Sequence, residues 1–165
     1  MQSKILNLEQ SNAIKAYNED TPSDKLLLER LYGKEVFNQK ITDRVKTFED
    51  ALELYPNKID PVLLNLLNYS GYDQDVISAQ STEKLKIIIK VLNEGRTLDW
   101  DNRDEYKYYP YFDMRNKTLV FYRYLSWHSD SFVSPRLCLK SRELAEYAGK
   151  QFIELYKESF LLNNL

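Results

Sequence analysis

The sequence predicts an α+β fold in which N-terminal helices precede a small antiparallel β-meander of about three strands, covered by a C-terminal helix. Three observations predict this order. Helix-capping residues punctuate the first hundred positions, aromatic and β-branched residues dominate from position 106, and an apolar stripe at helical spacing follows position 142. We expect a single domain over 1–165, with a helical part over about 1–98 and the sheet plus C-terminal helix over about 105–162.

The helices of the first part are predicted from the residues at their ends. Thr21-Pro22-Ser23-Asp24 supplies an N-cap and a proline at the first helical position, and Gly33 ends the leucine-rich run that follows. The same reasoning places further helices after Thr47, after Asp60-Pro61 and after Ser81, the last of which ends near Gly95. Residues 4–17 are also expected to be helical.

Strands are predicted at Tyr106–Phe112, Thr118–Trp127 and Arg136–Leu139, with a turn at Met114–Lys117. Pro110 restricts the first strand to an edge or an end, because proline has no N–H to donate to a neighbouring strand. In the second strand, simple alternation puts Arg123 on the same face as Phe121 and opposite Tyr122.

The C-terminal helix is predicted over about 142–161. Its apolar stripe consists of Leu144, Ala148, Phe152, Leu155 and Tyr156. We expect the first four of these side chains to pack on the sheet. Gly149 weakens a helix by about 1 kcal/mol relative to alanine, so it is expected to mark a close approach of this helix to a strand.

Composition places the chain among ordinary globular proteins, with 43% hydrophobic and 29% charged residues and a net charge of −2. The N-terminal residues lack the apolar core of a secretory signal, and no run approaches the roughly 20 apolar residues of a membrane-spanning helix. The single cysteine, Cys138, excludes an internal disulfide. We therefore expect a cytoplasmic protein with no membrane partner.

Several site classes are excluded by residues that the chain lacks. Its four glycines are too far apart for a dinucleotide fingerprint, a phosphate loop or a nucleophile elbow. One histidine and one cysteine cannot assemble a zinc site. The acidic run 99–105 lacks the spacing of a calcium loop and is interpreted as a solvated turn. No cofactor and no metal are expected.

Catalysis has one candidate arrangement, with Cys138 as nucleophile, His128 as base and Asp130 as the residue that orients the base. A cysteine that alternates with leucines is more often a small core residue, and a histidine among serines is more often a loop residue. We assign no catalytic residue and regard an enzyme as the third hypothesis.

The aromatic-basic segment, residues 106–142, is the most informative part of the chain. It holds ten of the 22 aromatic residues, and seven positive side chains against two negative ones. Such strands more often form a core than a site, so a sheet buried on both faces is one interpretation. The alternative is an exposed binding surface. Its candidate residues are Tyr108, Tyr109, Arg115, Lys117, Tyr122, Arg123 and Tyr124.

Several runs occur together in a specific order: Thr47–Ala51, Lys84–Gly95, Asp99-Trp100, Tyr106–Phe112 and Arg136–Phe152. This pattern resembles an uncharacterised family that recurs in gut Bacteroides-type bacteria and in their phages and mobile elements. The resemblance covers roughly residues 30–161 and implies phage or mobile-element ancestry. It implies no reaction.

The leading functional hypothesis is a non-enzymatic accessory or interaction module that binds a protein partner through the aromatic-basic segment, since tyrosine and arginine are enriched at protein interfaces. The alternative is a single-stranded nucleic-acid-binding protein that uses the same surface, because bases stack on aromatic rings while cations hold phosphates.

Overall fold

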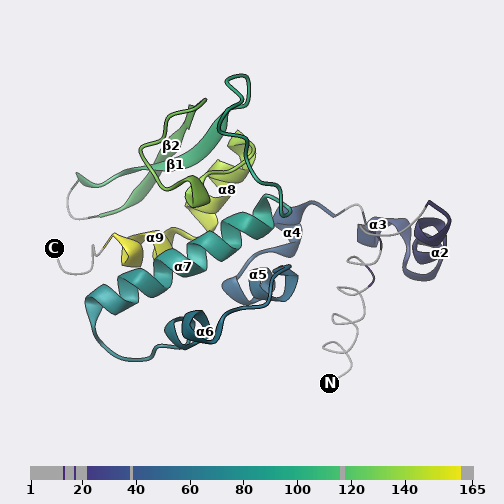
Figure 1. Cartoon of the computed structure of the whole chain (residues 1–165), viewed down its shortest axis with the longest axis horizontal. Helices are drawn as coiled ribbons and strands as arrows, with labels where there is room; N and C mark the ends of the chain where they lie inside the picture. The colour runs from purple at the N-terminus through teal and green to yellow at the C-terminus, as the bar shows by residue number, and fades with distance from the viewer. Residues whose placement is uncertain (1–12, 14–16, 18–21, 38, 116–117, 161–165) are drawn as a thin grey trace. The chain divides into compact units, whose positions relative to one another are not determined.

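The computed structural model describes residues 13, 17, 22–37, 39–115 and 118–160. The chain forms two compact units, residues 1–44 and 45–165. The expected α+β class is confirmed: helices come first, and an antiparallel hairpin and C-terminal helices follow (Figure 1). The expectation of a single domain stays a prediction. Most of the helix expected over 4–17 lies outside the described residues.

The first unit contains α2 (Pro22–Tyr32), α3 (Lys34–Phe37) and α4 (Ile41–Arg44). The predicted helix end at Gly33 is confirmed, since its φ of 85° is one that glycine adopts without strain. Tyr17 packs in this unit by stacking on Phe37, with ring centroids 4.3 Å apart, and donates a hydrogen bond to Glu29.

The second unit begins with α5 (Phe48–Leu54) and α6 (Pro61–Leu67), which start where their caps predict. Thr47 and Asp50 form a reciprocal capping box on α5, and Asp60 caps α6. The next helix, α7 (Gln74–Leu92), begins about two turns earlier than expected, because Asp73 rather than Ser81 accepts the first free N–H groups.

Helix α7 forms the core of the second unit. It contacts α5, α6, α9 (Ile153–Ser159) and the 3₁₀ turn η2 (Pro135–Leu137). Its apolar side chains are therefore buried on several sides: Leu85, Ile87, Ile88, Ile89, Val91 and Leu92. No helix in the described part of the chain is long and apolar enough to cross a membrane.

The sheet has two strands, β1 (Lys107–Asp113) and β2 (Val120–Trp127), paired antiparallel. The expected third strand at 136–139 is wrong. Ser134 accepts a hydrogen bond from the N–H of Arg136 and Pro135 occupies the first position of η2, so these residues start a helical turn. Only Leu139 joins β1, through a bridge to Tyr108.

The C-terminal helix is divided into α8 (Arg142–Gln151) and α9 at Phe152, whose φ of −110° and ψ of 28° depart from helical values. The division lets α8 contact both strands while α9 contacts α7. Leu144, Ala148 and Phe152 are buried as expected, whereas Leu155 is half-buried. The close approach expected at Gly149 is confirmed by its contact with Phe121 and Pro110.

Candidate functional site

A β-bulge in β2 determines which aromatic side chains reach the surface. Tyr111 pairs with Arg123 and Phe112 pairs with Phe121, so Tyr122 is an extra residue without a partner on β1. A bulge of this kind shifts the alternation of side chains by one position. The face assignment expected from simple alternation is therefore wrong: Tyr122 lies on the face of Arg123, and Phe121 lies on the opposite face.

The two faces of the hairpin have different environments. Phe121 and Pro110 lie on the inner face, against Gly149 of α8. On the outer face, the Arg123 guanidinium lies 5.7 Å from the ring centroid of Tyr111 and 5.5 Å from that of Tyr122. The two tyrosine rings are themselves 6.4 Å apart. The bulge thus assembles one cation between two aromatic rings on an exposed surface.

Three further apolar side chains extend this surface. Met114 is 49% exposed, Phe160 45% and Phe132 80%. Together with Tyr111 and Arg123 they line a groove of about 410 Å³. Leu125 and Val133 also line it. We call the set Tyr111, Met114, Tyr122, Arg123 and Phe132 the outer aromatic face.

The groove adjoins the open edge of β1. The N–H and C=O of Tyr108 both bond to Leu139, so they point away from β2. Backbone groups alternate along a strand, and those of Pro110 and Phe112 therefore point the same way. Among the described residues, no strand pairs with β1 on the side away from β2, where Leu139 supplies a single bridge. Pro110 lies on an edge, as expected, and its missing N–H faces the unpaired side.

The predicted binding tyrosines are separated by the fold. Tyr122 is 61% exposed on the outer aromatic face. Tyr109 is buried, packs with Leu98 and Cys138, and receives a hydrogen bond from Trp127. Tyr108 and Tyr124 are half-buried, and their rings contact each other at 5.8 Å. They share the inner face with Pro110, because side chains alternate along β1 and Pro110 pairs with Tyr124.

The predicted basic residues also differ from one another in exposure and in their partners. Arg123 is exposed and belongs to the outer aromatic face. Arg115 is exposed but forms an ion pair with Asp113, to which its Nε donates at 2.9 Å. Lys117 lies outside the described residues. Lys107, a further cation of the aromatic-basic segment, is 1% exposed and donates to the backbone carbonyls of Asn102 and Glu105.

Met114, Phe132 and Phe160 were not among the predicted binding residues. Phe132 lies in an irregular segment between β2 and η2, and Phe160 follows the last turn of α9. Side chains outside strands and helices have no periodic pattern that would indicate their exposure. The density of aromatic residues in the 106–142 segment was the only signal that pointed to Phe132.

Cys138 and His128 have different neighbours in the structure. The Cys138 thiol is 1% exposed, and burial raises its pKa above the usual value. Its sulfur contacts the Ser131 hydroxyl and the Ser134 carbonyl, both at 3.8 Å. The His128 ring instead packs on Tyr106, with centroids 4.0 Å apart. The interpretation of Cys138 as a core residue is confirmed, although it follows a 3₁₀ turn rather than lying in a strand.

Within the described residues, no group of three or more histidine, cysteine, aspartate or glutamate side chains is placed to hold a metal ion. Two acids of the 99–105 turn, Asp99 and Glu105, have local partners. Glu105 pairs with Arg96 and accepts the Asp99 N–H at 2.7 Å, and Asp99 accepts the Asp101 N–H at 3.0 Å.

Comparison of the chain with models of protein families, with curated proteins and with solved structures finds no match in any of the three.

Proposed function

We propose that this protein is a non-enzymatic interaction module of phage or mobile-element origin that acts in the cytoplasm and binds a protein partner through its outer aromatic face. The observation that carries the proposal is the exposed cluster of Tyr111, Tyr122 and Arg123 beside an apolar groove of about 410 Å³. Aromatic residues, methionine and arginine are the residue types enriched at protein interfaces. Lysine and glutamate are depleted there, and none of the described residues that line this groove is a lysine or a glutamate.

The charge distribution favours a protein partner over single-stranded nucleic acid. A nucleic-acid groove needs several free cations along the path of the backbone. Lys107 is buried and Arg115 is paired with Asp113, so Arg123 supplies the cation at the centre of the exposed cluster. A single arginine between aromatic rings suits an interface anchor better than a phosphate track.

The open edge of β1 supports an extended segment as the form of the partner. The backbone of such a segment can donate hydrogen bonds to the carbonyls of Pro110 and Phe112 and accept one from the N–H of Phe112. Alternate side chains of such a segment would enter the groove between Phe132 and Phe160. Backbone pairing supplies affinity in this mode, while the aromatic rings select the side chains.

The experiment compares proteins retained from the native host by immobilised wild-type protein and by three variants. Tyr122→Ala and Arg123→Ala remove the exposed cluster. Tyr72→Ala is the matched control, since Tyr72 is 94% exposed but lies between α6 and α7. We expect a partner that wild type and Tyr72→Ala retain and that the other two variants lose by at least tenfold.

Direct titration with mixed-sequence single-stranded DNA and RNA at low salt completes the test. Absence of nucleic-acid binding is expected. Tight binding that weakens steeply as salt rises would identify a nucleic-acid surface instead and contradict the proposal. Retention of the same partner by all three variants would also contradict it.

A further inference from the structure

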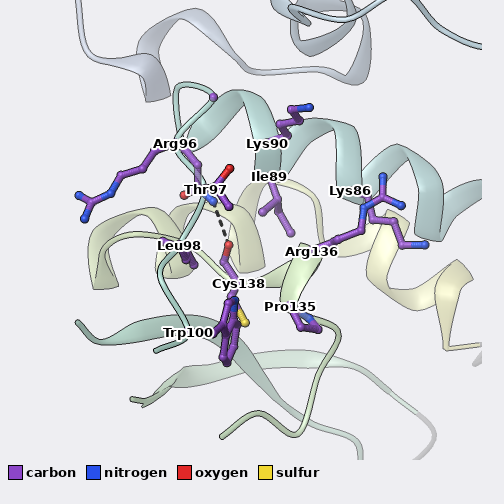
Figure 2. Close-up of a pocket in the computed structure, with 12 residues that line it drawn as sticks. Lys86, Ile89, Lys90, Arg96, Thr97, Leu98, Trp100, Pro135, Arg136 and Cys138 are labelled. Carbon is purple, nitrogen blue, oxygen red and sulfur yellow. Dashed lines mark hydrogen bonds between the residues drawn. The ribbon is translucent and has the colours of Figure 1, made fainter. Parts of the chain in front are cut away.

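A second cavity of about 380 Å³ lies between the C-terminal half of α7, the 95–100 segment and η2 (Figure 2). It lies apart from the outer aromatic face, and none of its lining residues belongs to that face. Among the residues that the structure describes, no acidic side chain lines it and four cations do: Lys86, Lys90, Arg96 and Arg136. In a chain with a net charge of −2, this is a local concentration of positive charge.

Two of these cations have no carboxylate partner among the described residues. Lys86 pairs with Glu83, and Arg96 pairs with Glu105. The Arg136 side chain, which extends from η2 toward α7 in Figure 2, forms neither a hydrogen bond nor an ion pair with any described residue. Lys90 has no acid beside it either, but its ammonium points away from Arg136 and Trp100 in Figure 2, over the ring of Tyr55 at 5.4 Å. An incoming anion would therefore meet uncompensated positive charge at Arg136.

The walls of this cavity are held in place before any ligand arrives. Asn93, at the end of α7, donates to the Cys138 carbonyl and accepts from the Lys140 N–H, both at 2.9 Å. It is 5% exposed and joins α7 to the segment that carries Arg136. The 95–100 wall is fixed by the bonds of Glu105 to Arg96 and to the Asp99 N–H. Such preorganisation lowers the entropic cost of binding.

The rest of the lining is apolar and includes one large ring. Trp100 is half-buried, and Lys107 lies 5.6 Å from the centre of its ring. Ile89, Leu98 and Pro135 complete the apolar lining. A cavity of a few hundred Å³ that combines an apolar lining with a few placed polar groups is the usual form of a small-molecule site.

We infer that this cavity binds a small organic anion, in which a phosphate or carboxylate on a planar ring bonds to Arg136 and the ring packs on Trp100. The guanidinium of Arg136 matches either group with two parallel hydrogen bonds. The site does not depend on the proposed protein partner, so the two proposals fail or hold separately.

The chain contains two tryptophans, which makes the indole N–H signals of an NMR spectrum a direct test. The Trp127→Phe variant assigns the signals, because it leaves only Trp100. We expect adenosine monophosphate or indole-3-acetate to shift the Trp100 signal to saturation while the Trp127 signal stays in place. Phenyl phosphate and benzoate, which carry the two groups on the same ring, identify phosphate or carboxylate as the preferred group. Adenosine, which carries no charge, should bind at least tenfold more weakly than its monophosphate.

The variant Arg136→Gln should weaken binding of the tighter ligand at least tenfold without unfolding the protein, because this side chain has no hydrogen bond or ion pair to lose in the described part of the chain. Arg142→Gln is the matched control, since Arg142 is an exposed arginine on α8 that does not line the cavity. Failure of both ligands to shift the Trp100 signal at low ionic strength would overturn the inference. An equal loss of affinity in both variants, or none in Arg136→Gln, would also overturn it.

Discussion

Gly149 of α8 lies so close to Phe121 of β2 that a Cβ atom on Gly149 would be 2.5 Å from Cδ2 of Phe121. The same Cβ would be 2.8 Å from Cβ of Pro110, an atom of a rigid ring in β1. The absence of a side chain at 149 therefore allows α8 to lie directly on the hairpin. This contact determines which face of the hairpin α8 covers.

Replacing Gly149 with alanine has two opposing effects on the stability of the fold. Helix propensity alone predicts that Gly149→Ala stabilises the protein by about 1 kcal/mol. Overpacking against Pro110 and Phe121 costs about 1–3 kcal/mol, so we expect a net loss of up to about 2 kcal/mol in the free energy of denaturant unfolding. Phe121→Leu should relieve part of this loss in the double variant. A gain in stability on Gly149→Ala would contradict the contact.

Asn93 is expected to contribute to stability through its two buried hydrogen bonds. Asn93→Ala leaves the Cys138 carbonyl and the Lys140 N–H without their partner. The expected cost is about 1–3 kcal/mol in the free energy of unfolding. Asn57→Ala, at an exposed position, serves as the control and should change stability by less than about 0.5 kcal/mol. Equal effects of the two substitutions would show that Asn93 does not connect α7 to the 138–140 segment.

Cys138 should react slowly with a soluble alkylating reagent at neutral pH. Burial blocks access to the thiol and raises its pKa, so the reactive thiolate is scarce. The rate should be the same in His128→Ala, because Cys138 contacts Ser131 and Ser134 rather than His128. Rapid labelling that slows in His128→Ala would instead indicate a base–nucleophile pair.

The Asp113–Arg115 pair predicts a measurable carboxyl titration. The hydrogen bonds from Arg115 lower the pKa of Asp113 to about 2, and NMR titration of wild type should give that midpoint. In Arg115→Ala the pKa should return toward its ordinary value of 3.8. Because the pKa of Asp113 is lower in the folded state than in the unfolded state, the pair stabilises the fold at pH values above the ordinary pKa of 3.8. That contribution is lost as the pH falls toward about 2. An unchanged midpoint in Arg115→Ala would show that Arg115 is not the partner.

The helices could be predicted because their caps are local. Thr47, Asp60-Pro61 and Gly33 act on backbone groups within one turn, and each marks a helix end in the structure. The Leu-Cys-Leu alternation around Cys138 suggested a strand, but a local signal of the same kind overrode it. Ser134-Pro135 immediately before it is itself a local start signal, and it produced a 3₁₀ turn where a strand was expected.

The candidate site could be predicted only in part. The aromatic-basic composition identified the hairpin, and two of its predicted residues, Tyr122 and Arg123, form the exposed cluster. Their common face could not be predicted, since a bulge is a property of strand pairing rather than of one strand's period. The burial of Tyr109 and Lys107 likewise depends on residues distant in sequence, such as Leu98 and Trp100.

Site-specific photo-crosslinking in the native host tests the central proposal most directly. The crosslinker p-benzoylphenylalanine replaces Tyr122 in one variant and Tyr72, a more exposed tyrosine outside the outer aromatic face, in another. The proposal predicts a discrete protein adduct from position 122 that resists nuclease, is absent from position 72, and disappears when Arg123→Ala is added. No adduct at position 122, the same adduct at both positions, or an adduct that nuclease removes would contradict a protein-binding role for this face.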